Sequence, residues 1–162
     1  MIDPEGQNQA YIFQINASPG GVPKLAVSAG EITFEGLAGD RQSNRDVHGG
    51  PDRALCLYSQ ERILALQREG HPIYPGAVGE NLTIAGLDWE AVAPGIRLVI
   101  GERVRIVLTR YTAPCNTIVA AFSDRNSNRI SQKLHPGWSR LYARVEQPGF
   151  IKVGDRIRVI RD

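Results

Sequence analysis

The order of apolar and polar residues along the chain predicts many short strands. Apolar and polar side chains alternate over residues 10–15, as expected for a half-buried strand. Residues 102–109 repeat this pattern and place Val104, Ile106 and Leu108 on one face. Extended structure is also predicted for six further segments: 24–34 (interrupted at Ala29-Gly30), 54–58, 81–84, 96–100, 142–146 and 155–160.

Helical periodicity is clear in one segment. Residues 60–69 place Ile63, Leu64 and Leu66 on an apolar face, and Ser59 precedes them as an N-cap. Strands at this spacing, with so few helices, are typical of all-β architectures rather than of parallel α/β sheets. The pattern therefore predicts a mainly β fold, a closed or nearly closed β-barrel with a few short peripheral helices.

Composition limits the classes of function. The length of 162 residues, without a linker or repeat, predicts a single domain over 1–162. A net charge of +2 is too small to indicate a nucleic-acid partner, and no apolar run approaches membrane-spanning length. Without a recognisable signal peptide, we expect a cytoplasmic protein with both thiols, Cys56 and Cys115, free. Cys56 lies within an unbroken apolar strand and is expected to be buried and inert.

Cys115 lies where a strand is expected to end and a short helix to begin. Pro114 disfavours helical geometry at Ala113, and Asn116 suits the N-cap of a helix that reaches Phe122. The positive end of a helix dipole favours a thiolate, the form that ligates metals and carries sulfur. A buried structural cysteine is the commoner fate of a lone thiol, and position alone does not separate these interpretations.

Glycine-rich polar segments carry the remaining candidate chemistry. They occupy residues 36–42, 48–53 and 79–83, and loops of this kind can bring backbone N–H groups and an arginine against an anion. Ser18 could present a hydroxyl to a phosphate, and the Asn81 amide could recognise the edge of a heterocycle. On composition alone, ordinary surface turns with paired Asp and Arg side chains are the simpler interpretation.

Taken together with Cys115, these segments resemble the MOSC domain, a module found at the C-terminus of molybdenum-cofactor sulfurases and in small stand-alone proteins. The resemblance covers about residues 10–160, nearly the whole chain. The matching segments occur in the family's order: Gly36-Leu37-Ala38-Gly39-Asp40-Arg41, His48-Gly49-Gly50-Pro51-Asp52-Arg53-Ala54 followed by Tyr58, Gly79-Glu80-Asn81-Leu82-Thr83, Pro114-Cys115, Tyr142-Ala143-Arg144-Val145 and Val153-Gly154-Asp155.

The resemblance implies a barrel-like fold with a pocket for a molybdopterin-type molybdenum cofactor. Cys115 matches the cysteine that carries a persulfide sulfur or ligates molybdenum, and Asn81 is expected near the cofactor. Ser18 and Arg41 match the phosphate-binding end of the pocket. His48 and Asp52 are expected to line the same pocket nearer to the metal or substrate. The alternative role of these last two residues is to hold their own glycine turn together.

Two functions follow from the resemblance. Relatives include the mitochondrial amidoxime-reducing component and bacterial reductases of N-hydroxylated purines, which implies an oxidoreductase that needs an external electron-donor protein. The alternative is a non-catalytic carrier that binds persulfide sulfur or cofactor, with a sulfurase or desulfurase as its partner. A member that has lost the cofactor is a third interpretation.

The chain also departs from larger relatives. The sulfurases add a pyridoxal-phosphate desulfurase domain, for which 162 residues leave no room. Some reductase relatives add a ferredoxin-like domain, whose cysteine cluster is missing. Many relatives place an arginine directly before the Pro-Cys pair, where this chain has Ala113. We therefore expect electrons or sulfur to come from a partner.

Overall fold

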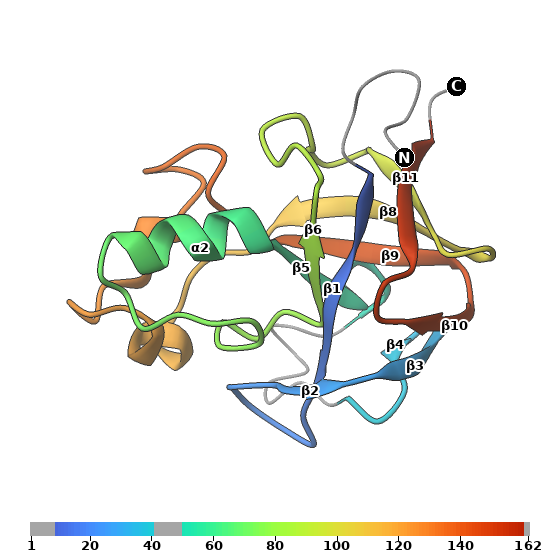
Figure 1. The fold of residues 1–162 in the computed structure, drawn as a ribbon, viewed down its shortest axis with the longest axis horizontal. Coiled ribbons are helices and arrows are strands. Elements are labelled where there is room, and N and C mark those ends of the chain that lie inside the picture. The colour runs from blue at the N-terminus through green and yellow to red at the C-terminus, as the bar shows by residue number, and fades with distance from the viewer. Residues whose placement is uncertain (1–8, 41–49, 161–162) are drawn as a thin grey trace.

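Seven strands close into a β-barrel in the computed structural model, which describes residues 9–40 and 50–160 (Figure 1). Their order around the barrel is β11 (Arg156–Ile160), β7 (Arg97–Ile100), β8 (Val104–Tyr111), β9 (Leu141–Gln147), β5 (Leu55–Ser59), β6 (Leu82–Ala85) and β1 (Ala10–Ala17). The pairing of Ala10 with Ile157 joins β1 to β11 and closes the barrel. Closure leaves none of these seven strands as a free sheet edge.

Smaller elements surround the barrel. Strand β2 (Leu25–Val27) pairs with β1, while β3 (Ala29–Thr33), β4 (Gly36–Leu37) and β10 (Gly149–Lys152) form a separate small sheet. Helix α2 (Gln60–Arg68) lies in the crossover between the parallel strands β5 and β6 (Figure 1). The 3-10 helices are η1 (Pro51–Arg53), η2 (Asn116–Ala121) and η3 (Ser127–Ile130).

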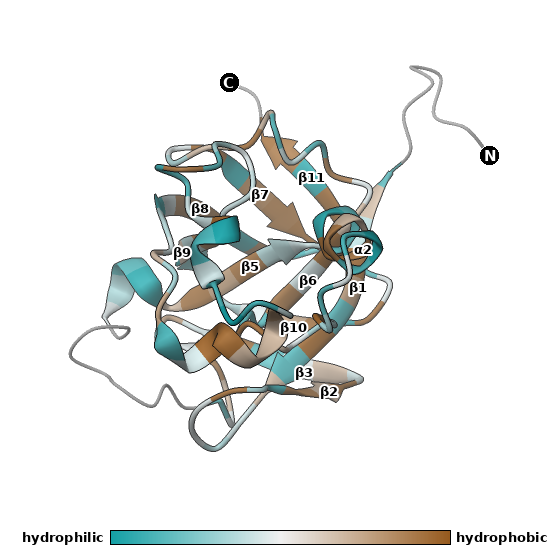
Figure 2. Ribbon diagram, turned by 90° about the vertical axis from the view of Figure 1, so that its left-hand side faces the viewer, coloured by the Kyte–Doolittle hydropathy of each residue, from teal (hydrophilic) through white to brown (hydrophobic). Residues whose placement is uncertain are grey.

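The hydrophobic core fills the barrel and continues beneath α2. Figure 2 shows apolar positions concentrated along the barrel strands. Ile63 and Leu66 of α2 are fully buried in the same cluster. Fully buried aliphatic residues come from most barrel strands, among them Ile12, Ile15, Leu55, Leu57, Leu82, Ile84, Leu98, Ile100, Val104 and Ile106. The alternation read from the sequence is therefore the inward and outward alternation of barrel strands.

The structure confirms the mainly β barrel and the helix after Ser59. The Ser59 hydroxyl accepts a hydrogen bond from the Arg62 backbone N–H at 3.1 Å, as an N-cap should. Strand β8 ends at Tyr111, later than predicted. The segment 24–34 divides at Ser28 into β2 and β3, rather than at Ala29-Gly30. Among the described residues, no helix is long and apolar enough to cross a membrane.

Two short strands were missed by sequence reasoning. β4 has two residues, and β10 begins with Gly149 and follows Pro148. Neither has an alternating pattern long enough to be recognised in the sequence. Both are held in place by their pairing with β3. The simpler interpretation of the segment that contains β4 was a surface turn, which is how isolated glycine-containing stretches ordinarily behave.

Candidate functional site

A buried carboxylate, that of Asp40, joins three segments that are distant in sequence. Its Oδ2 forms an ion pair with Lys24 Nζ at 2.6 Å and accepts a hydrogen bond from Asn81 Nδ2 at 2.9 Å. Its Oδ1 accepts from the Ser18 backbone N–H at 2.9 Å. The Lys24 and Asp40 side chains are only 6% and 7% exposed. Each charge therefore requires the other, because an unpaired buried charge is strongly destabilising.

Asn81 connects this ion pair to the first thiol. Its side-chain Oδ1 accepts a hydrogen bond from the Cys56 backbone N–H at 3.0 Å, and the Asn81 backbone N–H donates to the Cys56 carbonyl at 2.8 Å. Cys56 is buried, and its Sγ lies 3.8 Å from Thr112 Oγ1. Burial raises the pKa of the Cys56 thiol. A continuous polar path thus runs from Asp40 to Thr112, at the base of the segment that carries Cys115.

Arg140 adds a buried positive charge to the same region. It is 5% exposed, and its Nη1 donates to the Val78 carbonyl at 2.8 Å. Its Nη2 donates to the Ala113 carbonyl at 3.3 Å, and its Nε has no partner among the described residues. Arg140 therefore anchors the turn before Cys115, and no carboxylate of the described residues lies within ion-pair distance of its guanidinium.

Cys115 itself is half-buried and is the N-cap of η2. Its Sγ lies 2.8 Å from Thr117 Oγ1, and its carbonyl accepts from Ser127 Oγ at 3.3 Å. The prediction that Asn116 caps this helix is wrong, because Asn116 is the first residue inside it. η2 is also a six-residue 3-10 helix, too short for a substantial dipole. The Thr117 hydroxyl is the local group able to donate to the sulfur.

Tyr142 lies near both thiols. It is the cross-strand partner of Cys56 in the β5–β9 pair, and the Arg53 guanidinium lies 5.7 Å from the centroid of its ring. Burial raises the pKa of Tyr142 to about 12, and charge repulsion from the Cys56 and Cys115 thiols acts in the same direction. The phenol therefore stays protonated at neutral pH and can donate a hydrogen bond.

Glu80 is a second buried carboxyl, fully enclosed beside the Asp40 network. Its Oε2 accepts from Thr83 Oγ1 at 3.0 Å. Burial raises the pKa of Glu80 to about 7, although a hydrogen bond from the Gly76 N–H, the Thr83 hydroxyl and the charge of Arg140 act in the opposite direction. This carboxyl can hold a proton close to neutral pH.

The structure brings together some of the sequence-predicted site residues. Ser18 and Asn81 meet at Asp40, but the Ser18 hydroxyl donates to the Gly20 carbonyl and accepts from the Gly20 N–H. Asp52 forms an exposed ion pair with Arg144 at 2.6 Å rather than joining the Asp40 network. The other two predicted residues, Arg41 and His48, lie outside the described residues.

Sequence reasoning missed the roles of Lys24, Asp40, Arg140 and Thr117. Asp40 belongs to the glycine-rich segment 36–42, but no neighbouring residue indicates its partners Lys24 and Asn81, which lie 16 and 41 positions away. Lys24 was read as the start of an extended segment. A lysine directly after a proline in an otherwise apolar stretch is the one signal that could have singled it out.

The residues present fit an anionic metal cofactor. In the part of the chain that the structure describes, no three His, Cys, Asp or Glu side chains are grouped to hold a metal. Cys115 can therefore offer a metal a single thiolate, which suits a metal that arrives with ligands of its own. The guanidinium groups of Arg140 and Arg53, which both act on Tyr142, suit an anionic ligand.

Comparisons with known proteins agree with the sequence resemblance. The family model of the MOSC domain matches residues 44–158. Protein YiiM of Escherichia coli (strain K12) is 38% identical over 161 residues, covering 93% of this chain and 70% of that protein. The uncharacterized protein YflK of Bacillus subtilis (strain 168) is 29% identical over 136 residues, covering 83% of this chain. The match spans only 60% of the length of YflK.

A solved structure shares the fold. The crystal structure of YiiM from Geobacillus stearothermophilus superimposes with a TM-score of 0.71 at 24% identity. The match covers 94% of this chain and 75% of that one. The barrel described above is therefore an architecture already seen in proteins of similar sequence.

Replacing Asp40 by Asn should destabilise the protein by ~3–5 kcal/mol, because Lys24 would remain buried without a counter-charge. Asp52→Asn, which breaks the exposed pair with Arg144, is the matched control and should cost less than ~1 kcal/mol. Urea unfolding followed by circular dichroism measures both. Equal losses in the two variants would contradict the central role of the Lys24–Asp40 pair.

Glu80 should make stability depend on pH. Its pKa of about 7 in the folded chain exceeds its ordinary value of 4.5, so the folded state retains a proton that the unfolded state loses between these values. The free energy of unfolding should therefore fall as pH rises through this window. Glu80→Gln should lack this fall and gain stability relative to the unmodified protein between pH 5 and pH 8. Parallel pH profiles for the two proteins would refute the assignment.

Cys115 should react with a small alkylating agent faster than Cys56. Cys115 is half-buried at a turn, whereas Cys56 is enclosed within β5 and its pKa is raised. Brief treatment of the native protein with iodoacetamide, followed by peptide mass spectrometry, measures both sites in one sample. Unfolding in urea should equalise the two rates, and preferential native labelling of Cys56 would overturn the assignment.

Proposed function

Since the chain belongs to the MOSC domain family, we propose that it binds a molybdopterin-type molybdenum cofactor and reduces N-hydroxylated compounds. The observation that carries this proposal is the half-buried thiol of Cys115, which follows a turn held by the buried guanidinium of Arg140. A thiolate is a soft ligand suited to such a metal, and an arginine suits the anionic parts of the cofactor.

Each residue of the site has a distinct part in this proposal. Cys115 Sγ would hold the metal, and the Thr117 hydroxyl would donate to that sulfur and limit its motion. Arg140 keeps the turn before Cys115 in place through the Ala113 carbonyl. Asp40 orients the Asn81 amide, which we propose lies near the pterin. Preorganised groups of this kind keep the reacting centre in one geometry.

Further residues carried over from the family would bind the rest of the cofactor. Arg41 and Ser18 would contact its phosphate, where a bidentate guanidinium and backbone N–H groups suit a dianion. His48 is proposed nearer to the metal. We propose that Asp52 also lies on the metal side of the pocket, although its carboxylate pairs with Arg144 in this structure.

The overall reaction defines the partner that the protein needs. When bound, the cofactor supplies a metal able to accept oxygen from the substrate. Conversion of an N-hydroxyl group to an amine releases water and consumes a pair of electrons and a pair of protons. A separate electron-donor protein would supply the electrons, because the described residues contain no cluster of side chains able to hold a further redox centre. Glu80 and Tyr142 are the nearby side chains that hold protons at neutral pH.

The alternative function, a carrier of persulfide sulfur, uses the same thiol. Such a carrier needs an accessible cysteine and a surface for its desulfurase partner. It makes no use of a buried guanidinium that holds the turn before the thiol. The buried polar network therefore favours the cofactor-dependent enzyme.

Cys115→Ser should abolish reduction of an amidoxime by the protein purified from a host that makes the molybdenum cofactor. The fold should be unchanged, because Cys115 is half-buried and contributes little to the core. Cys56→Ser is the matched control and should retain activity if it folds. Reduced methyl viologen serves as the electron donor, and metal analysis of each variant reports bound molybdenum.

The carrier interpretation predicts a different result. Cofactor-loaded protein would then turn over no N-hydroxylated compound, while incubation with a cysteine desulfurase and cysteine would add the mass of one sulfur at Cys115. Protein from a host unable to make the cofactor is the background for both measurements. These two results together would contradict the reductase function and support a sulfur carrier.

A further inference from the structure

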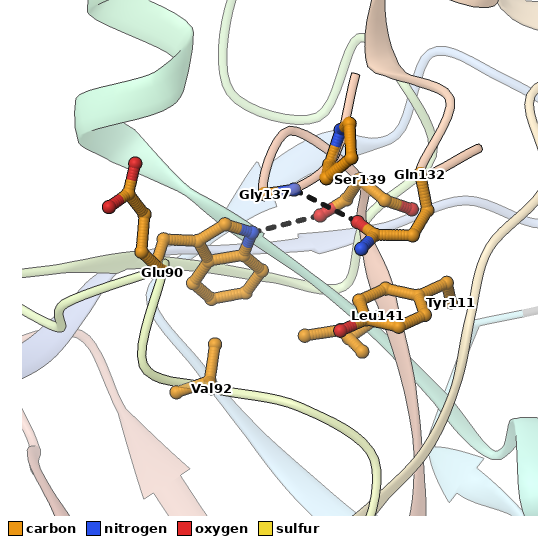
Figure 3. A pocket seen from close by; sticks show the side chains of 9 residues that line it. Glu90, Val92, Tyr111, Gln132, Gly137, Ser139 and Leu141 are labelled. Carbon is orange, nitrogen blue, oxygen red and sulfur yellow. Dashed lines mark hydrogen bonds between the residues drawn. The ribbon is translucent and has the colours of Figure 1, made fainter. Parts of the chain in front are cut away.

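A small pocket lies on a part of the fold that shares no residue with the Cys115 site. Its volume is about 250 Å³, and we call it the Trp89 pocket (Figure 3). Trp89, Val92 and Leu141 are buried walls of this pocket, and Tyr111 and Gln132 complete it. Ligand pockets for drug-sized molecules begin at roughly 300 Å³, so this one suits a molecule of one or two rings.

Two polar groups face the cavity and form no hydrogen bond with another described residue. Figure 3 shows the Gln132 amide nitrogen and the Tyr111 hydroxyl facing the space beside Trp89. Gln132 Oε1 is already used, because it accepts from the Gly137 N–H at 3.0 Å. The Trp89 indole N–H is likewise used, since it donates to the Ser139 carbonyl at 2.8 Å. The cavity therefore offers an N–H donor and a hydroxyl between apolar and aromatic walls.

The segment that supplies Gly137 and Ser139 to the pocket is held rigidly. Trp138, which lies between them in the sequence, contacts two guanidinium groups, those of Arg62 at 4.4 Å and Arg129 at 4.1 Å from its ring centroid. Arg62 Nε also donates to the Gly137 carbonyl at 3.0 Å, and Tyr58 Oη donates to the Trp138 carbonyl at 2.7 Å. A site whose walls are already ordered loses little conformational entropy when a ligand enters. Nothing in the proposed molybdenum chemistry requires this arrangement.

We propose that the Trp89 pocket binds a flat, uncharged heteroaromatic ring that accepts a hydrogen bond. The aromatic walls of Trp89 and Tyr111 suit a ring, and Gln132 Nε2 requires an acceptor such as a ring nitrogen or a carbonyl oxygen. Among the described residues that line the pocket, Glu90 alone is charged, and Figure 3 shows its carboxylate turned away from the cavity. A charged ligand would therefore find no counter-charge inside.

Titration with benzimidazole and indole tests this proposal without any cofactor. The two probes have the same shape, but indole lacks the ring-nitrogen acceptor. The chain has two tryptophans, so the indole N–H signals in a ¹H–¹⁵N spectrum separate the pocket wall, Trp89, from Trp138. Benzimidazole should shift the Trp89 signal saturably, with a dissociation constant on the order of 1 mM. Indole should bind at least about fivefold more weakly.

Gln132→Glu identifies the donor. It keeps the oxygen that accepts from Gly137 but replaces the N–H donor by a carboxylate oxygen, so benzimidazole affinity should fall about fivefold or more. Tyr111→Phe should weaken binding less, and Glu146→Gln, which removes an exposed carboxylate that does not line the pocket, should leave it unchanged. Absence of a saturable Trp89 shift in the unmodified protein would overturn the proposal. Equal affinity of the two probes, or unchanged benzimidazole affinity in both Gln132→Glu and Tyr111→Phe, would also overturn it.

Discussion

The buried ion pair between Lys24 and Asp40 is the contact on which the arrangement of the candidate site depends. The pair is nearly inaccessible to solvent, so the two charges stabilise the fold only while they remain together. The same carboxylate also holds Ser18 and Asn81. The side chain of Asp40 thus adds to the backbone hydrogen bonds that join Asn16 to Asn81 and Lys24 to Gly76, and it ties its own segment to both.

The closed barrel makes that geometry rigid. Asn81 is bound to Cys56 of β5 by two hydrogen bonds, and β5 is paired on both sides, with β6 and β9. A displacement of the Asp40 network would therefore have to move a fully paired strand. Close-packed interiors resist such movement, which is the property that a site for a large cofactor requires.

Buried polar groups in this protein serve two different purposes. Around Asp40 they are paired and fix the backbone, whereas Arg140 retains an unused donor and has no carboxylate partner in the described residues. A buried guanidinium with an unused donor, bonded to the turn before the half-buried Cys115 thiol, is costly for stability and is typical of binding sites. Around Trp89, by contrast, the unused donors face a small cavity lined mainly by apolar and aromatic side chains. The two regions are therefore suited to ligands of different chemistry.

The sequence by itself determined the class of fold, the helix capped by Ser59 and the family. These depend on local periodicity and on short motifs, and both are visible without knowledge of distant contacts. Only the tertiary structure decided which side chains meet. Lys24, Asp40 and Asn81 carry no local mark of their contact, Asp52 pairs with Arg144, and Cys115 rather than Asn116 caps η2. The physical reason is that burial and partner choice arise when the barrel closes and brings distant segments together. The sequence neighbours of a residue therefore do not indicate which distant side chains it will contact.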